Sequence, residues 1–199
     1  MRDYYEQLWQ QMPPDLTPAD LVRRRRFLLS VLRAGDRVLD LGCGEGTFSG
    51  LAAEGGARSV IGADIAEAAL DRARRAHPEL SFQRVDPDRP LPFGDNGFEL
   101  VWASEVIEHI ADTAVWLSEI RRVLAPEGRV AITTPDHGRL RLLVGGVERY
   151  SQPLGDHLHL YTRRSLHHVL SEFAFGQVVV RAEGGTPFAR RMLLARGQR

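Results

Sequence analysis

Residues 38–50, with the sequence VLDLGCGEGTFSG, decide the fold class of this 199-residue chain. The pattern predicts a buried strand that ends at Asp40, followed by a turn and the start of a helix. Glycines at every second position of this turn let the backbone bend tightly and approach a ligand, which side chains would prevent. The three glycines are Gly42, Gly44 and Gly46. The stretch therefore predicts a ligand-binding loop at the carboxyl edge of a sheet.

The residues around these glycines distinguish between two kinds of nucleoside ligand. A dinucleotide fingerprint requires a further glycine at position 47, where this sequence has Thr47. A carboxylate at Asp40 would also repel a pyrophosphate, whereas it suits a ligand that carries an ammonium group and a sulfonium. S-adenosylmethionine carries both groups, so we expect it as the cofactor.

Two further carboxylates follow the next two predicted strands. Asp64 ends the run SVIGAD, where it can accept hydrogen bonds from both ribose hydroxyls of a nucleoside. Asp86 ends the run LSFQRVD, where it can accept from an adenine amino group beside the main chain of Pro87. The alternative for Asp86 is a turn residue that faces solvent. Together with the glycine loop, these carboxylates predict one nucleoside site at the ends of successive strands.

Short apolar runs alternate with amphipathic ones along the middle of the chain, which is typical of a parallel sheet covered by helices on both faces. The predicted strands begin at Arg37, Ser59, Leu80, Phe98 and Arg129, and the predicted helices span residues 47–55, 66–76, 112–125 and 162–172. In the tail, FGQVVVRAE (175–183) and TPFARRMLLAR (186–196), joined by Gly184-Gly185, predict a hairpin. We therefore expect a doubly wound α/β domain over residues 35–199.

Two regions stand apart from this alternation. Residues 135–161 are rich in glycine and proline and longer than most connections, so we expect a lid or substrate loop there. Residues 1–34 are expected to form a helical cap, in which Arg23–Arg26 stand among apolar positions. This pattern favours a solvated helix face with the leucines packed inward. A basic surface for membranes or polyanions and a cover over the cofactor are the alternatives.

Composition excludes several classes of function. The 26 acidic residues balance the 26 basic ones, so we expect no nucleic-acid partner. Every basic residue is Arg, which removes lysine Schiff-base chemistry and the P-loop lysine. Cys43 is the only cysteine and cannot form an internal disulfide, and we expect no membrane span and a cytoplasmic location. The sequence makes no prediction of the oligomeric state.

The glycine motif and two later runs resemble the motif series of class I S-adenosylmethionine-dependent methyltransferases, especially the ubiquinone-biosynthesis O-methyltransferase branch. The runs are VDPDRPLPFGDNGFELVWASEVIEHI (85–110) and LSEIRRVLAPEGRVAITTP (117–135), with a weaker echo in DHLHLYTRRSL (156–166). The resemblance implies a Rossmann-like sheet of seven strands, mostly parallel, with an antiparallel final strand. One departure is Glu127, where relatives usually have a glycine.

The resemblance also assigns the expected cofactor contacts. The methionine portion falls to Asp40, Gly42, Cys43, Gly44 and Gly46, the ribose to Asp64 and Ile65, the adenine to Asp86 and Pro87, and the face of the cofactor to Ala103 and Ser104. Cys43 would be a small packing residue, because a nucleophilic thiol needs a base partner that nothing nearby supplies.

The expected chemistry is modest, because a sulfonium methyl is already activated. The enzyme would align an O, N or C atom of a small-molecule acceptor with the methyl group and exclude water. His109 is the candidate catalytic residue, as a general base for a hydroxyl acceptor, with a structural or substrate-orienting role as the alternative. A third alternative is a divalent ion: Glu105, Glu108 and His109 are spaced for one helical face, and His157 or His159 could complete the site. We expect no metal.

Three functions of different classes remain open. A methyltransferase that acts on a small molecule and releases S-adenosylhomocysteine is favoured. An NAD-dependent oxidoreductase and a non-catalytic nucleoside-binding module are the alternatives. Among methyltransferases, a metal-assisted RNA 2′-O-methyltransferase is the less favoured class, although a similar Glu-x-x-Glu-His pattern occurs in such enzymes.

Overall fold

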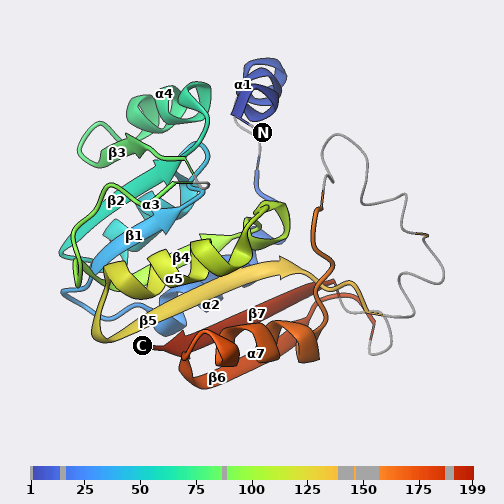
Figure 1. The fold of residues 1–199 in the computed structure, drawn as a ribbon. Coiled ribbons are helices and arrows are strands. Elements are labelled where there is room, and N and C mark those ends of the chain that lie inside the picture. Colours follow the sequence, from blue (N-terminus) through green and yellow to red (C-terminus); the bar gives the residue numbers. More distant parts are fainter. Residues whose placement is uncertain (1, 14–16, 87–88, 139–145, 147–156, 187–190) are drawn as a thin grey trace.

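The described residues form a seven-stranded sheet at the centre of the fold (Figure 1). The structure is a computed structural model that describes residues 2–13, 17–86, 89–138, 146, 157–186 and 191–199. The strands are β1 (Arg37–Leu41), β2 (Ser59–Asp64), β3 (Ser81–Arg84), β4 (Phe98–Ser104), β5 (Leu124–Pro135), β6 (Gly176–Glu183) and β7 (Met192–Gln198). Their order across the sheet is β3-β2-β1-β4-β5-β7-β6.

Most neighbouring strands of the sheet are parallel. β1 pairs with β2 and β4, β2 with β3, and β4 with β5, all in parallel. β7 runs antiparallel to both β5 and β6. The predicted doubly wound sheet with an antiparallel final strand is therefore confirmed.

Helices pack on both faces of this sheet (Figure 1). They are α1 (Arg2–Gln11), α2 (Leu21–Val31), α3 (Thr47–Glu54), α4 (Glu67–Ala76), the 3₁₀ helix η1 (Ile107–His109), α5 (Thr113–Val123) and α7 (Arg163–Glu172). The four helices predicted from amphipathic runs correspond to α3, α4, α5 and α7, with ends that differ by at most two residues. Helix α7 begins where predicted because Thr162 forms a capping box with Ser165.

Two hydrophobic cores lie on opposite faces of the sheet. Successive side chains of a strand point to opposite faces, so neighbouring residues separate into the two cores. Leu39 and Val101 join the core beneath α5 and α7. Val38 and Leu100 join the core beneath α2 and α3. The continuous apolar runs of β1 and β4 are explained by this burial on both faces.

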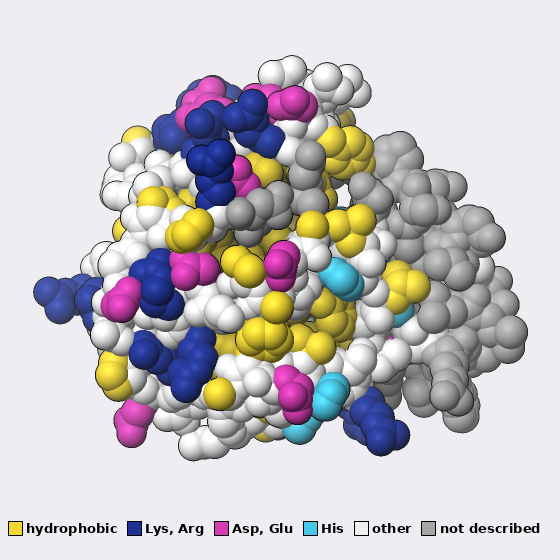
Figure 2. Space-filling view, in the orientation of Figure 1, with side chains coloured by type: hydrophobic (Ala, Val, Ile, Leu, Met, Phe, Trp, Pro, Cys, Tyr) yellow, Lys and Arg dark blue, Asp and Glu magenta, His cyan; other side chains and the backbone are white. Residues whose placement is uncertain are grey.

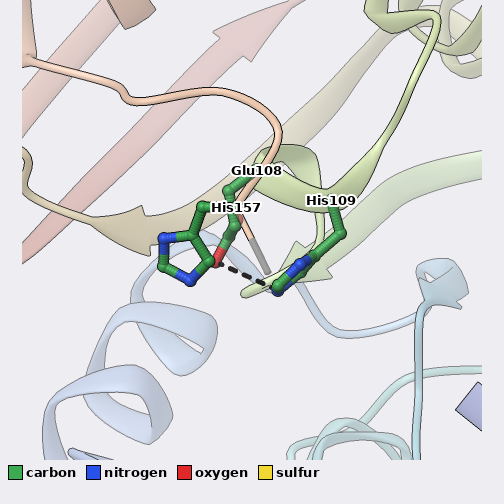
Figure 3. Close-up of side chains that lie close together, drawn as sticks. All are labelled: Glu108, His109 and His157. Carbon is green, nitrogen blue, oxygen red and sulfur yellow. Dashed lines mark ion pairs between the residues drawn. The ribbon is translucent and has the colours of Figure 1, made fainter. Parts of the chain in front are cut away.

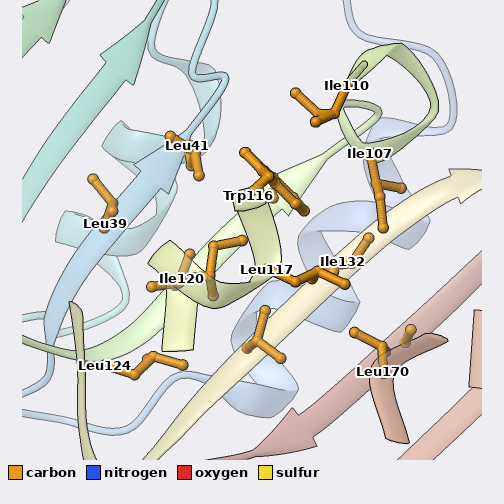
Figure 4. Close-up of a cluster of buried hydrophobic side chains, with 14 of the residues drawn as sticks. Leu39, Leu41, Ile107, Ile110, Trp116, Leu117, Ile120, Leu124, Ile132 and Leu170 are labelled. Atoms are coloured by element: carbon orange, nitrogen blue, oxygen red, sulfur yellow. The ribbon is translucent and has the colours of Figure 1, made fainter. Parts of the chain in front are cut away.

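Helix α5 supplies much of the larger core. Asp112 caps its start by accepting a hydrogen bond from the Val115 N–H at 3.0 Å. Its buried residues recur at helical spacing, and Figure 4 shows Trp116, Leu117 and Ile120 within the cluster that contains Ile132 of β5. One face of α5 therefore attaches the helix to the sheet.

The first part of β5 differs from the prediction. The strand predicted to begin at Arg129 begins at Leu124, because Leu124 already pairs with Phe98 before the register shifts. Glu127 lies in this irregular stretch with φ of 60°, a left-handed conformation that favours glycine. The glycine expected there from the resemblance thus corresponds to a real backbone requirement.

The predicted hairpin is confirmed, but its connection is longer than the Gly184-Gly185 pair. Glu183 pairs with Met192, so the second strand begins at Met192 and not at Thr186. Residues 187–190 lie outside the described part of the chain. The same holds for residues 139–145 and 147–156, which make up most of the predicted lid.

We expect Leu117→Ala to lower the free energy of unfolding by about 2–5 kcal/mol, because truncating a fully buried leucine leaves a cavity. Val115→Ala on the same helix is the control: Val115 is 44% exposed, and its truncation should change stability by less than about 0.5 kcal/mol. Urea denaturation measures both. Equal losses for the two variants would contradict the assigned orientation of α5.

Candidate functional site

A cavity of about 670 Å³ lies at the carboxyl ends of β1 and β4. The chain leaves β1 toward β2 and leaves β4 toward β5, in opposite directions along the sheet. Ligands of open α/β sheets bind at such a point of reversal. Seven of the residues predicted for the site line this cavity, namely Gly42, Cys43, Gly44, Asp64, Ile65, Ser104 and His109.

The glycine loop forms one wall of the cavity. Gly42 has φ of 78°, and a Cβ added there would lie 2.3 Å from Val106 Cγ2. Gly44 has φ of 54°, and a Cβ there would lie 2.9 Å from the Trp9 ring. The Gly42 and Cys43 N–H groups both donate to the Ala63 carbonyl, at 2.7 and 3.0 Å, which joins the loop to the end of β2. Val106 and Trp9 therefore occupy the space of a side chain at these two positions, and glycine is required there.

Asp64 joins the glycine loop to the turn after β2. One carboxylate oxygen accepts from the Gly44 N–H at 2.9 Å and the other from the Ala66 N–H at 3.0 Å. The residue is 8% exposed, and burial raises the pKa of its carboxyl. The neighbouring Ile65 also lines the cavity. Asp64 thus holds the loop in shape at the position where the sequence predicts a ribose contact.

Asp40 lies beneath the loop and not in the wall of the cavity. The Ser49 hydroxyl donates to its carboxylate at 2.6 Å, and the residue is 2% exposed. Burial raises the pKa of Asp40 to about 7. Asp40 would therefore act on a cationic ligand in the cavity by its charge, without direct contact.

The remaining predicted cofactor residues occupy four different environments. Gly46, with φ of 85°, precedes α3 and packs against α4. Ala103 is fully buried in the core, whereas Ser104 faces the cavity. Asp86 is exposed, and its carboxylate lies 3.6 Å from Arg89 Nε. Pro87 lies outside the described residues.

Arg24 is a site residue that sequence reasoning missed. Its Nε donates to the Ser104 hydroxyl at 2.8 Å, and it lines the cavity while only 7% exposed. The expectation of a solvated face therefore holds for the exposed Arg25 and Arg26 but is wrong for Arg24. Helical spacing was the available signal, because Arg24 stands on the same face as the buried Leu28 and Val31.

Helix α1 forms another part of the cavity wall, with Tyr5 and Trp9 lining the cavity and Trp9 packed against Gly44 of the glycine loop. The Glu6 carboxylate accepts from the Glu67 N–H at 2.7 Å, at the start of α4. The Arg72 guanidinium donates to the Trp9 carbonyl at 2.8 Å, at the end of α1. The middle and the last turn of α1 are thus attached to α4. No motif in the sequence pointed to these contacts.

His109 lines the cavity at the end of η1, beside Tyr5 of α1. The single helical face predicted for Glu105, Glu108 and His109 is wrong. Glu105 has φ of 59°, which breaks the helix, and its carboxylate accepts instead from the Thr133 hydroxyl at 2.9 Å.

Glu108 and His109 instead meet His157 (Figure 3). One potential ligand atom from each lies within 4.8 Å of the others. Glu108 is fully buried: one carboxylate oxygen accepts from the Thr134 hydroxyl at 2.9 Å and the other lies 3.9 Å from His109 Nε2. Burial, and then the nearby Glu105, raise the pKa of Glu108. His159 is outside this group, and its backbone N–H donates to the Glu108 carbonyl.

The charged side chains on the outer surface do not point to a particular class of partner. Figure 2 shows basic and acidic side chains interspersed over the face seen in Figure 1. Among the described residues, no helix has the length and apolar character needed to cross a membrane.

A family model described as a methyltransferase domain matches residues 8–178. Demethylmenaquinone methyltransferase of Beutenbergia cavernae is 35% identical over 126 residues, 61% of this chain and 52% of that protein. The 27-O-demethylrifamycin SV methyltransferase of Amycolatopsis mediterranei is 37% identical over 107 residues, 51% of this chain and 39% of that protein. The crystal structure of an S-adenosylmethionine dependent methyltransferase from Mesorhizobium loti superposes with a TM-score of 0.69 and 23% identity, covering 92% of this chain and 98% of that one.

The chain spans only part of the curated relatives that it matches, 52% of the Beutenbergia protein and 20% of a bifunctional biotin-biosynthesis protein from Cellvibrio japonicus. The family model nevertheless covers most of the chain. Of the three classes of protein left open by the sequence, the match is to the methyltransferases. The chain belongs to the class I S-adenosylmethionine-dependent methyltransferase family.

Proposed function

We propose that this chain transfers a methyl group from S-adenosylmethionine to a small molecule bound in the 670 Å³ cavity. One observation carries the proposal: the glycine loop, Asp64 and the aromatic residues of α1 line a single cavity at the reversal point of the sheet. Its volume lies within the range of about 300–1,000 Å³ that is usual for cofactor and ligand sites.

The residues present suit the cofactor. Gly42 and Gly44 line the cavity and have no side chain, so their backbone can contact the methionine portion. Asp64 has further lone pairs for ribose hydroxyls, with Ile65 beside it. We also propose that Asp86 and Pro87 contact the adenine. Ser104 is proposed to lie along the face of the cofactor. When bound, S-adenosylmethionine supplies the activated methyl group.

Residues 1–34 are proposed to act as a cap over this site, and residues 35–199 as the methyltransferase domain. The contacts of Tyr5 and Trp9 with the cavity support this division, and so do the hydrogen bonds from α4 to Glu6. The cover over the cofactor that the sequence left as an alternative thereby becomes the favoured role of this segment. Substrate selection by residues 135–161 stays a prediction.

The acceptor is proposed to have an apolar body and a hydroxyl or similar nucleophile. Much of the cavity wall is apolar, including Leu8, Met12, Val106, Ile110 and Trp116. The two curated relatives described above are named for demethylmenaquinone and for 27-O-demethylrifamycin SV, which are different acceptors. Balanced surface charge gives no support to an RNA substrate.

His109 is proposed to be the general base. Its side chain is 19% exposed and faces the cavity, so an acceptor hydroxyl can reach it. The Glu108 carboxyl, 3.9 Å from His109 Nε2, would stabilise the imidazolium that forms when His109 takes the proton. The distances among Glu108, His109 and His157 would also permit these residues to bind a divalent ion.

We expect Asp64→Ala to weaken S-adenosylhomocysteine binding by about 1.5–3 kcal/mol, the usual cost of losing charge-assisted hydrogen bonds. Titration calorimetry on the folded variant measures this. Asp71→Ala, on the exposed side of α4, is the control and should bind as the wild type does. Unchanged affinity in Asp64→Ala, or binding of NAD by the wild type in place of S-adenosylhomocysteine, would contradict the assignment.

We expect His109→Ala to lower kcat by about 10²–10⁴ while leaving S-adenosylhomocysteine affinity nearly intact, because a general base acts in the transition state. Release of S-adenosylhomocysteine with a panel of phenols as acceptors provides the assay. His168→Ala, at an exposed position of α7, should behave as the wild type. A folded His109→Ala protein that turns over within about threefold of wild type would exclude the base role.

A further inference from the structure

Three histidines from separate segments meet beside Glu108. His109 ends η1, His137 follows β5, and His157 follows residues 147–156 in the sequence. His137 Nε2 and His157 Nδ1 are 2.9 Å apart, which is a hydrogen bond. The His157 and His109 rings meet edge to face, with centroids 5.0 Å apart. The three rings therefore form a continuous series that ends at the cavity.

The backbone determines which nitrogen of His137 carries the proton. The Tyr161 N–H donates to His137 Nδ1 at 2.9 Å, and a backbone amide can only donate. The Tyr161 carbonyl lies 3.2 Å from the same nitrogen and accepts from the His137 backbone N–H at 2.8 Å, but a proton on Nδ1 would be directed against the Tyr161 N–H. Nδ1 is consequently an acceptor, so the neutral ring of this fully buried residue carries its proton on Nε2.

The tautomer of His157 follows from that of His137. The His137 Nε2–H points to His157 Nδ1, so Nδ1 of His157 must also be an acceptor. Burial, with the adjacent His109 and His137 rings, lowers the pKa of His157 to about 4, and the ring is neutral near pH 7. A neutral ring with an accepting Nδ1 carries its proton on Nε2. His157 thus has an N–H, and not a lone pair, on the other side of its ring.

The buried carboxylate of Glu108 is a suitable acceptor for this N–H. Its Oε1 has no hydrogen-bond partner within the described part of the chain, although the atom is buried. In Figure 3 the Glu108 carboxylate lies beside the His157 ring, with a dashed line to His109. One potential ligand atom from each of the three residues lies within 4.8 Å of the others. Catalytic hydrogen bonds are often long in unliganded structures and shorten in the complex.

The same tautomers disfavour a metal at this group. An imidazole that binds a metal presents a lone pair to the ion and usually donates its other N–H to a neighbouring acceptor. His157 has the reverse arrangement, because its Nδ1 accepts from His137. An ion could bind only if both rings exchanged tautomers, which would place a second N–H against the Tyr161 N–H.

We propose that His137 and His157 are positioning residues that direct the His157 Nε2–H to Glu108 Oε1, so that Glu108 stays ionised and balances the charge on His109. This role rests on the proposed base function of His109. The acceptor O–H bond breaks, its proton moves to His109, and the oxygen keeps the electron pair. A hydrogen bond to the charged form of Glu108 opposes the effect of burial, which favours its neutral form.

The most direct test is a long-range ¹H–¹⁵N spectrum of the ¹⁵N-labelled wild-type protein near pH 7, which identifies histidine tautomers. His137→Gln and His157→Gln assign the signals. We expect both residues in the Nε2–H form. An Nδ1–H form of His157 would overturn the proposal. This measurement needs no cofactor or acceptor, so its result is independent of whether the proposed methyl transfer is correct.

Kinetics provide a second test. His137→Gln keeps an N–H donor for His157, whereas His137→Leu removes it. We expect the Leu variant to lose about tenfold in kcat with an unchanged KM for S-adenosylmethionine, and the Gln variant to stay within about threefold. Equal kcat values for both folded variants would overturn the positioning role.

Titration of chelator-treated protein with Zn²⁺ or Mn²⁺ examines the metal alternative directly. We expect no stoichiometric binding that depends on His157 and Glu108. Binding of one ion per chain that is lost in both His157→Ala and Glu108→Gln would overturn the proposal and assign this group to a metal.

Discussion

The absence of a side chain at Gly42 is the steric constraint on which the site depends. The backbone there adopts a left-handed conformation, and Val106 occupies the space that a Cβ would fill. Because Val106 packs against the loop, the segment after β4 comes close to the end of β1. His109 consequently lines the same cavity as Asp64, although 44 residues separate them in the sequence.

The N-terminal helices complete a site that the sheet alone leaves open. Helix α1 contacts the glycine loop through Trp9, and α4 binds the middle of α1 through Glu6 and its last turn through Arg72. Helix α2 contributes the buried Arg24, whose hydrogen bond to Ser104 connects it to the end of β4. Burial lowers the pKa of this guanidinium, while Glu105 and Asp40 oppose the effect. The cap and the sheet therefore share one network of contacts around the cavity.

The order of strands and helices could be predicted because apolar periodicity and the glycine loop are local signals. For the same reason, the sequence correctly indicated that Gly42, Cys43 and Gly44 of the glycine loop line the cavity. The prediction failed where distant contacts decide the conformation: Glu105 turns out of the helix toward Thr133, and Arg24 is buried by β4. The hydrogen bond between His137 and Tyr161 could not be predicted either, since its two partners lie 24 positions apart in the sequence.

Hydrogen exchange measured by mass spectrometry, with and without S-adenosylhomocysteine, tests the central claim that one cavity between the glycine loop and α1 holds the cofactor. The account predicts slower exchange at residues 42–47, at 64–66 and along α1, with little change in β6, at the edge of the sheet farthest from β2, and in α7, which packs on β6. Protection confined to another part of the molecule, or binding without protection of the glycine loop, would contradict it.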